Sequence, residues 1–379
     1  MKNFIPYGRQ FIDEDDIKAV KEILHLVLIT QGPRIDEFEA RVADFCQMPY
    51  AVAFNSGTSA LHGAMYAAGI GEGDEVITTP LTFVATANAA LYVGAKPVFV
   101  DIDRDNYCID IEQIEAAITP RTKAIAPVDY AGYPVNISRI REIADKHNLV
   151  IIEDAAHALG AIRQGKMVGA EADMTMFSFH PVKHITTGEG GVIVCNNPEY
   201  YRRLKSFRSH GITKDTELLE GYPYPWYYEM QELGYNFRIT DIQCALGISQ
   251  MNKLEGFLSK RRLLAARYEQ ALGKLKWLRI PPTPSEGSLH AYHLYPLLLD
   301  ADINRLDFYN YLKENNVGSQ VHYFPVHLQP YYRKNFAYKV GDFPNAEDFY
   351  ERQLSMPLFP GLTMEEQEWV IKVIEGYGG

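Results

Sequence analysis

A single lysine stands where its neighbours could make it a nucleophile. In the stretch SFHPVKHITTGEGG, residues 178–191, Lys183 follows a short apolar run, precedes a glycine-rich turn and has a histidine nearby on each side. Most lysines are solvated surface residues, but a lysine whose pKa is lowered by burial or by cations forms Schiff bases. The glycines permit positive φ and a tight return to the next strand. The stretch therefore predicts a buried, reactive Lys183.

A strand-to-helix turn earlier in the chain is suited to an anion. In NSGTSALHGA, residues 55–64, we expect a strand to end at Phe54 and a helix to begin near Ser59, with Gly57 and hydroxyl side chains between them. Free N–H groups and the positive end of a helix dipole bind phosphate. Neither a Walker A loop nor GxGxxG is present, so nucleoside triphosphate and dinucleotide binding are not indicated. An ordinary Ser or Thr N-cap is the alternative that this turn leaves open.

A carboxylate and a histidine follow another expected strand. In EDAAHALG, residues 153–160, Asp154 ends an apolar run and His157 lies three residues further on. Ligands of open α/β sheets bind beyond the carboxyl ends of strands. A buried carboxylate there requires a cation or several hydrogen bonds, and the protonated ring nitrogen of a heterocycle would serve. The alternative is a helix-capping aspartate beside a satisfied core histidine.

The elements between these motifs bring them into one architecture. Short apolar runs predict strands at 51–54, 75–79, 97–100, 123–128, 149–154, 174–179 and 191–195, and helices are expected at 59–68, 111–118, 138–147 and 198–207. This alternation predicts an α/β fold with a mostly parallel central sheet covered on both faces. A phosphate turn, an acid for a pyridine nitrogen and a Schiff-base lysine at strand ends are the parts that pyridoxal 5′-phosphate requires, so we expect that cofactor.

A second domain is expected in the C-terminal third. The 379 residues exceed the usual ~100–200 of one domain. A helical region at about 240–275 precedes a strand-like run at 290–299 and helices near 304–315 and 364–374. We therefore predict a large α/β domain at 1–250 and a smaller α+β domain at 251–379. The aromatic segment 217–230 is predicted to be an ordered loop, lying either at a subunit contact or folded onto its own domain.

Composition excludes several classes of protein. The formal net charge of −11 disfavours a nucleic-acid partner, which normally meets a basic surface. No apolar run is long enough to span a membrane, and the N-terminus is unlike a secretory signal, so we expect a cytoplasmic protein. The four cysteines are scattered and no His/Cys cluster suggests zinc, so no metal is expected.

Eight stretches resemble one family along the whole chain. The chain is similar to the DegT-type sugar-nucleotide aminotransferases, which are pyridoxal-phosphate enzymes of fold type I. Members that dehydrate sugars carry a histidine where this chain has Lys183, so the resemblance implies aminotransfer. The matching stretches are ITQGPRIDEFE, FNSGTSALH, TPLTFVATANA, EDAAHALG, FSFHPVKHITTGEGG, RSHGI, GYNFRITDIQCALG and LSMPLFPGL.

Further stretches resemble one branch of that family, and they imply a substrate. VDYAGYPVNI, YYEMQELGYNFRITD and SQVHYFPVHLQPYYR look most like the branch that acts on the pathway to pseudaminic acid. That branch transfers an amino group from L-glutamate to C4 of UDP-2-acetamido-2,6-dideoxy-β-L-arabino-hex-4-ulose, giving UDP-4-amino-4,6-dideoxy-N-acetyl-β-L-altrosamine. An aminotransferase for another nucleotide-linked 4-keto sugar, of the perosamine or 4-amino-arabinose type, is the nearest alternative. A non-catalytic regulatory protein that binds the cofactor is a further one.

The resemblance also assigns cofactor-binding residues. Lys183 carries the cofactor covalently, Asp154 pairs with the pyridinium nitrogen, and His157 lies near the ring hydroxyl. Phe83 stacks on the ring face. Asn236 reaches the phosphate of the neighbouring subunit's cofactor, which implies an obligatory homodimer with shared active sites. The phosphate of the chain's own cofactor is bound by Gly57, Thr58 and Ser178.

Substrate contacts are implied in three further segments. Arg208 and Arg238 are candidates for the substrate diphosphate, with structural ion pairs as the alternative that stays open. The remaining positions that match the family's substrate contacts are Tyr7, Val27, Leu28, Ile29, Thr30, Gln320, Val321, His322 and Tyr323.

Overall fold

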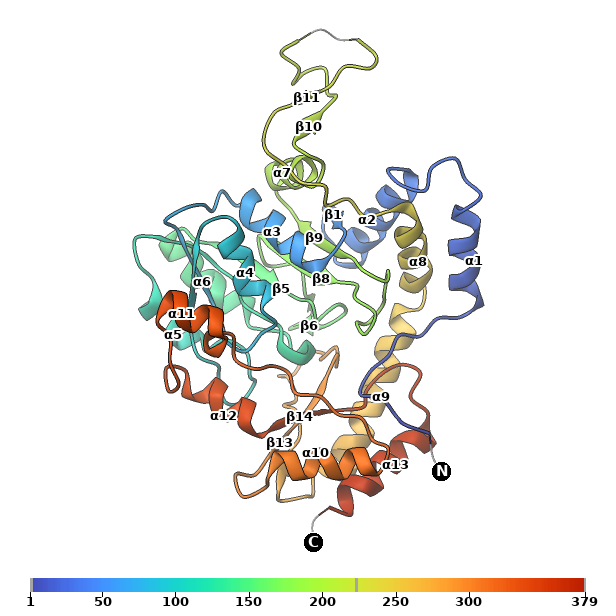
Figure 1. Cartoon of the computed structure of the whole chain (residues 1–379), viewed down its shortest axis with the longest axis vertical. Coiled ribbons are helices and arrows are strands. Elements are labelled where there is room, and N and C mark those ends of the chain that lie inside the picture. The colour runs from blue at the N-terminus through green and yellow to red at the C-terminus, as the bar shows by residue number, and fades with distance from the viewer. Residues whose placement is uncertain (1–2, 222–223, 378–379) are drawn as a thin grey trace.

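A seven-stranded sheet lies at the centre of the computed structural model, which describes residues 3–221 and 224–377 (Figure 1). The strand order is β1-β9-β8-β5-β4-β2-β3. Only β9 runs antiparallel to its neighbours in this sheet; the other pairings are parallel, as the sequence predicts. The strands are β1 (Tyr50–Phe54), β2 (Glu75–Thr78), β3 (Lys96–Phe99), β4 (Thr122–Ile125), β5 (Val150–Asp154), β8 (Met174–Ser178) and β9 (Gly191–Cys195).

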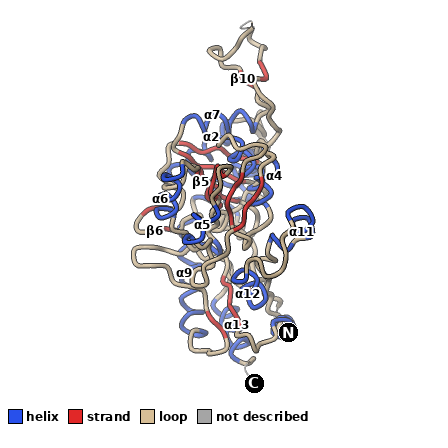
Figure 2. Tube along the Cα trace, turned by 90° about the vertical axis from the view of Figure 1, so that its left-hand side faces the viewer, coloured by secondary structure: helices blue, strands red, loops and turns tan. Residues whose placement is uncertain are grey.

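Helices cover both faces of the sheet because its strands are apolar on both sides. Alternate residues of a strand point to opposite faces. Ile151 of β5 accordingly packs with one group of helices and Ile152 with the other. Figure 2 shows α5 and α6 on one side of the strands and α4 on the other. The helices are α1 (Glu14–Ile23), α2 (Pro33–Phe45), α3 (Gly57–Ala67), α4 (Ala85–Tyr92), α5 (Ile111–Ala117), α6 (Ile137–His147) and α7 (Pro198–Arg208).

The C-terminal third builds a small antiparallel sheet with helices around it. The helical region expected at 240–275 is two helices with a break at 252–253, and the run at 290–299 forms a strand only from Tyr295. The elements are α8 (Asp241–Met251), α9 (Leu254–Leu272), β12 (Leu278–Arg279), β13 (Tyr295–Leu299), α10 (Arg305–Glu314), α11 (Pro330–Phe336), α12 (Pro344–Arg352), β14 (Gln353–Met356) and α13 (Met364–Glu375).

The helix α9 packs into two separate apolar cores. Phe257 and Leu258 near its start pack among residues of the large sheet. Leu264 and Tyr268 further along pack with β13, β14 and α13. The predicted division at residue 250 stays a prediction, and α9 is the element that ties the two parts together.

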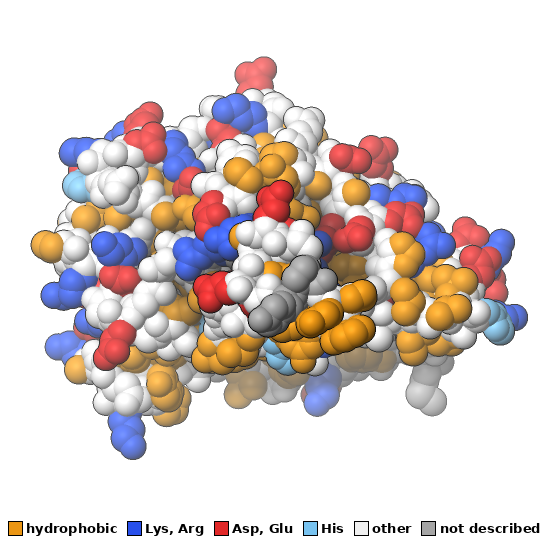
Figure 3. All heavy atoms as spheres, turned by 90° about the horizontal axis from the view of Figure 1, so that it is seen from above, with side chains coloured by type: hydrophobic (Ala, Val, Ile, Leu, Met, Phe, Trp, Pro, Cys, Tyr) orange, Lys and Arg blue, Asp and Glu red, His pale blue; other side chains and the backbone are white. Residues whose placement is uncertain are grey.

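An arm leaves the body of the molecule after α7. Its short strands β10 (Ile212–Thr213) and β11 (Glu229–Met230) pair with each other and carry the aromatic segment 217–230 away from the rest of the chain (Figure 1). Residues 222–223 of that segment lie outside the described part. The rings of Tyr224 and Trp226 stack with centroids 5.3 Å apart. Figure 3, which looks onto the arm from above, shows hydrophobic side chains gathered at its projecting end. The segment is therefore not folded onto its own domain.

Two further short strands, β6 (Ile162–Arg163) and β7 (Lys166–Met167), form a hairpin after the segment that carries Asp154.

Over residues 3–221 and 224–377, no helix is both long and apolar enough to cross a membrane.

Candidate active site

One cavity of about 460 Å³ gathers the motifs that the sequence singles out. It lies at the carboxyl ends of β5 and β8 and at the start of α3, where ligands of such sheets bind. The predicted residues that line it are Tyr7, Gly57, Thr58, Phe83, Asp154, His157, Ser178, Lys183, His322 and Tyr323.

The turn before α3 forms a cradle for an anion. The helix begins at Gly57, two residues earlier than expected, and Ser56 is its N-cap, accepting a hydrogen bond from Ser59 N at 3.1 Å. The turn is therefore an N-cap, as the alternative interpretation expected. The first N–H groups of the helix, at Gly57 and Thr58, still have no acceptors inside the helix and can bind an anion. A Cβ at position 57 would lie 3.2 Å from Met176 Sδ, so glycine leaves room for an anion in this cradle.

A second glycine lets β9 approach the cradle. A Cβ on Gly191 would lie 2.5 Å from Ser56 O and 2.7 Å from Gly57 N, distances that no side chain tolerates. In the preceding turn, Gly188 has φ +80°, as the glycine-rich sequence predicts. Close backbone approach is thus the reason for glycine at 191, whereas backbone conformation is the reason at 188.

Asp154 is the last residue of β5, and its buried carboxylate has no cationic partner among the described residues. Its side chain is 5% exposed, and Oδ2 accepts from Thr86 Oγ1 at 2.6 Å while Oδ1 accepts from Ala156 N at 3.1 Å. Burial raises the pKa of Asp154, although both hydrogen bonds and the charge of Lys183 act to lower it. No Lys or Arg of the described residues forms an ion pair with it. A protonated ring nitrogen would supply the missing charge, so the alternative of a simple helix cap does not account for this carboxylate.

His157 is a neutral, oriented imidazole. Burial holds its pKa well below the usual value, and the positive charge of Lys183 acts in the same direction. Its Nδ1 accepts from Ala131 N at 3.3 Å, which leaves the proton on Nε2. That nitrogen lies 3.1 Å from the Tyr323 hydroxyl and donates to it. The hydroxyl proton of Tyr323 is therefore free to point elsewhere in the cavity.

Lys183 lies in the loop after β8 and lines the cavity. Burial, helped by the charge of Arg261, lowers its pKa to about 8 although Asp154 acts to raise it. An amine with this pKa is partly unprotonated near neutral pH, as a nucleophile and proton carrier must be. The structure thus supports the reactive lysine inferred from the sequence.

The segment 320–323 divides between the cavity and the small core. His322 and Tyr323 line the cavity, and the ring of Tyr7 lies 5.3 Å from that of His322. Gln320 instead pairs through its backbone with Ser355 beside β13, and Val321 packs against the small core. Gln320 and Val321 are therefore not brought to the cavity, because one is engaged beside Ser355 and the other in the small core.

Two predicted segments lie outside the cavity of their own chain. The loop after α1 that holds Val27, Leu28, Ile29 and Thr30 is exposed, and Val27 is 99% exposed. Asn236 is exposed where the chain returns from the arm. Their predicted roles require a second copy of the chain and remain predictions.

Arg208 is another predicted site residue that the geometry places away from the cavity. Its guanidinium is 8% exposed, donates to Glu39 Oε1 at 2.5 Å and to Ala53 O at 2.7 Å, and does not line the cavity. It is a buried structural ion pair, the alternative that the sequence left open. Arg238 is half-buried and has no ion pair within the described residues.

Sequence reasoning did not single out Thr86 or His293 among the residues of the cavity region. The hydroxyl of Thr86, at the start of α4, binds both Asp154 and Thr82 Oγ1, the latter at 2.8 Å. Its signal was its place in TPLTFVATANA, three residues after Phe83. His293 lines the cavity wall from a segment read only as strand-like. Nothing in its local pattern pointed to the lysine over 100 residues earlier.

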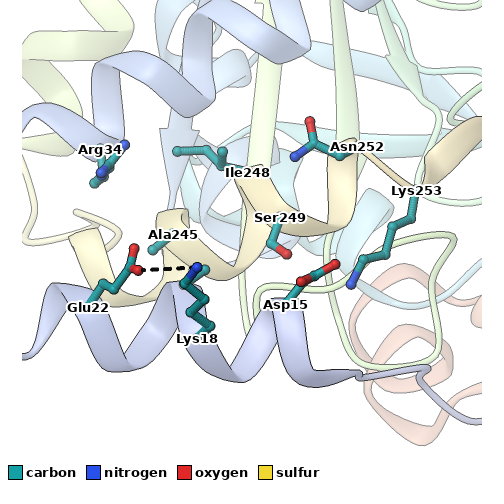
Figure 4. A pocket seen from close by; sticks show the side chains of 10 residues that line it. Asp15, Lys18, Glu22, Arg34, Ala245, Ile248, Ser249, Asn252 and Lys253 are labelled. Atoms are coloured by element: carbon teal, nitrogen blue, oxygen red, sulfur yellow. Dashed lines mark ion pairs between the residues drawn. The ribbon is translucent and has the colours of Figure 1, made fainter.

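A second hollow of about 470 Å³ lies between α1 and α8. In Figure 4 the side chains of Lys18 and Glu22 face one another along α1, with Nζ and Oε1 4.0 Å apart, and Lys253 extends from the break between α8 and α9. None of the predicted site residues lines this hollow.

The comparison with known proteins agrees with the site. Residues 10–375 match the profile of the DegT/DnrJ/EryC1/StrS aminotransferase family. The chain belongs to this family. Among its relatives is the spore coat polysaccharide biosynthesis protein SpsC of Bacillus subtilis, 40% identical over 98% of this chain and 96% of the relative.

Solved structures of sugar aminotransferases share the whole fold. Helicobacter pylori PseC, an aminotransferase involved in the biosynthesis of pseudaminic acid, is 34% identical with a TM-score of 0.91, over 99% of this chain and 100% of that one. The pyridoxal-phosphate form of the putative sugar aminotransferase Spr1654 from Streptococcus pneumoniae is 30% identical with a TM-score of 0.92, over 98% of each chain. This family member is a pyridoxal-phosphate-dependent sugar aminotransferase of fold type I.

The residues of the cavity fit the cofactor. The carboxylate of Asp154, which has no ion-pair partner, suits the ring nitrogen of the cofactor. The open cradle at Gly57 suits its phosphate, and the lowered pKa of Lys183 suits reaction with its aldehyde. Asp154, Lys183 and His157 would hold the ring, Phe83 would cover it, and Gly57, Thr58 and Ser178 would hold the phosphate.

Proposed function

We propose that the enzyme transfers the amino group of L-glutamate to C4 of UDP-2-acetamido-2,6-dideoxy-β-L-arabino-hex-4-ulose. The product would be UDP-4-amino-4,6-dideoxy-N-acetyl-β-L-altrosamine, on the pathway to pseudaminic acid. The observation that carries the proposal is the joint placement of Tyr7, His322 and Tyr323 in the cavity wall with Lys183. His322 and Tyr323 lie in a segment that resembles the pseudaminic acid branch, Tyr7 matches a substrate contact of the family, and PseC is a neighbour over the whole chain.

The neutral, polar wall suits an uncharged sugar ring. Burial lowers the pKa of His322 to about 3, and it raises the pKa of the Tyr323 phenol, so neither is charged near neutral pH. The Tyr323 hydroxyl accepts from His157 and can donate its own proton to a sugar oxygen. Tyr7, whose pKa is also raised by burial, offers a second hydroxyl. The wall can thus orient hydroxyl and carbonyl groups by hydrogen bonds.

The chain's own residues divide the chemistry among them. When bound, pyridoxal phosphate supplies an electron sink that accepts the charge left when the donor loses its α-proton. Asp154 keeps the ring nitrogen protonated, which maintains that sink. Lys183, with a pKa of about 8, would take the α-proton and return it to the carbon on the other side of the nitrogen, first as base and then as acid. The same lysine would repeat these steps in reverse with the keto sugar. The reaction is ping-pong because the keto acid formed from glutamate leaves before the keto sugar binds.

We further propose a homodimer in which each chain completes the other's cavity. Asn236, the loop at 27–30 and half-buried Arg238 lie outside the cavity of their own chain, as residues that serve a neighbour would. On the arm, Trp226 is 74% exposed and Met230 is 63% exposed. Exposing these apolar side chains to water is unfavourable, and a partner surface would cover them. The cytoplasmic location expected from the sequence stays a prediction.

A panel of nucleotide-linked keto sugars tests the proposal. Purified enzyme is first converted by L-glutamate to its pyridoxamine form, and the loss of the aldehyde absorbance is recorded. Each sugar is then added, and the proposal expects the absorbance to return fastest with the UDP-linked β-L-arabino-hex-4-ulose. Faster recovery with a perosamine or 4-amino-arabinose precursor would assign the alternative substrate. A failure to respond to glutamate and to every sugar would point to a non-catalytic protein.

A further inference from the structure

Ser355 of β14 holds the imidazole of His322 from behind the cavity wall. The serine hydroxyl lies 2.9 Å from His322 Nδ1, and this is the one hydrogen bond of that hydroxyl in the described part of the chain. Ser355 is fully buried, and its backbone pairs with that of Gln320 through hydrogen bonds of 2.8 and 3.2 Å. The carbonyl of His322 accepts from the Tyr130 hydroxyl at 2.6 Å. Both residues of the contact are therefore fixed in place.

The burial of Ser355 determines which ring nitrogen of His322 carries the proton. Burial, helped by the charge of Lys183, lowers the pKa of His322 to about 3, so the ring is neutral near neutral pH and has one N–H. If that N–H were at Nδ1 and donated to the serine, the hydroxyl proton would be buried without an acceptor, which is unfavourable. The serine therefore donates to Nδ1, and the proton of the ring lies on Nε2.

This protonated nitrogen opens to the cavity. His322 lines the cavity, and over residues 3–221 and 224–377 its Nε2 forms no hydrogen bond, yet it is not among the polar atoms sealed from solvent without a partner. The hydroxyl of the next residue, Tyr323, accepts from His157 and can donate into the same cavity. The wall thus offers two neutral donors, each held from behind by a protein group. A carbonyl oxygen, which can only accept, suits such a wall.

We infer that Ser355 is a positioning residue: by donating to Nδ1 it keeps the proton of His322 on Nε2, from which the ring donates a hydrogen bond to a carbonyl oxygen of the keto sugar. The opposite tautomer would turn a lone pair toward that oxygen, and the two would repel. The carbonyl is the C4 ketone, or the acetamido group where the sugar has one. The inference rests on the keto-sugar half of the proposed reaction and is independent of which nucleotide-linked keto sugar is the substrate.

The tautomer can be observed directly in the pyridoxamine-phosphate form of the intact enzyme. Nitrogen NMR of protein labelled at its histidines distinguishes a ring nitrogen that carries a proton from one that does not, and loss of signals in His322→Gln identifies those of His322. We expect the proton on Nε2 in the wild type, and an Nδ1 signal that shifts in Ser355→Ala because its hydrogen bond is gone. A wild-type proton on Nδ1, or an Nδ1 signal that Ser355→Ala leaves in place, overturns the inference.

A double-mutant cycle separates this role from a merely structural one. The keto sugar is titrated against the pyridoxamine form, and the return of the aldehyde absorbance gives the half-saturating concentration. That concentration should rise about 3- to 10-fold in His322→Leu, as expected for one neutral hydrogen bond, and by no more than this in Ser355→Ala. In the double variant it should equal that of His322→Leu, because Ser355 acts only through the ring. Additive effects of the two substitutions would refute the inference.

Ser355→Thr is the matched control, because it retains the hydroxyl. It should keep the wild-type tautomer and half-saturating concentration, and a folded Thr variant that behaves like Ser355→Ala would contradict the assigned role. If the Leu or Thr variant does not fold, the nitrogen spectra decide.

The choice of sugar identifies the carbonyl and keeps this test apart from that of the substrate. With a 4-keto sugar that lacks the acetamido group, the effect of Ser355→Ala should persist if the ketone is bound and disappear if the acetamido oxygen is bound. A panel in which another keto sugar reacts fastest would change the proposed substrate. It would leave this test intact, since the cycle is run with whichever sugar reacts.

Discussion

Removing the hydroxyl of Thr86 should impair the enzyme chiefly through Asp154. The hydroxyl donates to Asp154 Oδ2 at 2.6 Å, the shorter of the two hydrogen bonds that this buried carboxylate receives from the protein. Thr86 is 1% exposed, so water cannot replace the lost donor. Thr86→Val keeps the shape of the side chain and removes the hydrogen bonds of the hydroxyl to Asp154 and to Thr82 Oγ1. A hydrogen bond to a charged group contributes about 1.5–3 kcal/mol. If the whole of this energy is lost from the stabilisation of the transition state, the rate falls about 10- to 100-fold.

The pH dependence gives the sharper signature. Burial already raises the pKa of Asp154, and the Thr86 hydroxyl is one of the groups that hold it down. Without that hydroxyl the pKa rises further, so the working carboxylate is lost at a higher pH than in the wild type. We therefore expect the acidic limb of the rate profile to move to higher pH in Thr86→Val, with activity partly recovered on the alkaline side.

Single-turnover measurements with L-glutamate across pH 5.5–9 provide the assay, with the absorbance of the bound cofactor as the signal. Thr86→Ser retains the hydroxyl and is the matched control; it should keep the wild-type profile. Coincident profiles for the wild type and Thr86→Val, or the same displacement in Thr86→Ser, would refute the assigned role of this hydrogen bond.

Three other outcomes follow from the geometry. Lys183→Ala should fold and bind pyridoxamine phosphate yet show no turnover with donor or keto sugar, because it removes the amine that would carry the cofactor and move the proton. Arg208→Met should lower the melting temperature, since the buried Glu39 would keep only its longer ion pair with Lys205, at 3.6 Å, a loss toward the lower end of about 3–5 kcal/mol, and should leave KM for the nucleotide sugar unchanged; a raised KM in a stable protein would restore its predicted substrate role. Gly57→Ala should weaken cofactor binding about tenfold in an equilibrium titration, because its Cβ would lie 3.2 Å from Met176 Sδ in the cradle, and normal affinity would count against that cradle.

Local pattern sufficed for the sheet and for the three motifs because each is encoded within a few residues. Strands covered on both faces read as continuous apolar runs, and all seven predicted runs fall on strands of the central sheet. The helix α4 went unpredicted because ATANAALY has no polar face: it is enclosed between the sheet and α3, and period-based reasoning needs a contrast between faces.

Contacts between distant segments were beyond local pattern. Gln320 and His322 look equally plausible as substrate contacts in the sequence, and only the pairing of Gln320 with Ser355 decides which side faces the cavity. Arg208 likewise carries no mark of its partner, since Glu39 lies 169 positions away. His293 was missed for the same reason. The sequence was therefore a better guide to the chemistry of the site than to the side chains that surround it.

The path of α9 through both cores limits how the protein can be dissected. A fragment ending at residue 250 would lack Phe257 and Leu258, leaving a gap among the side chains of the large sheet. The complementary fragment would display those same residues to water, and Arg262 would lose the carbonyl of Gly160 to which it donates. Split versions intended for reassembly would therefore fare better with a cut in the projecting arm than at the apparent domain boundary.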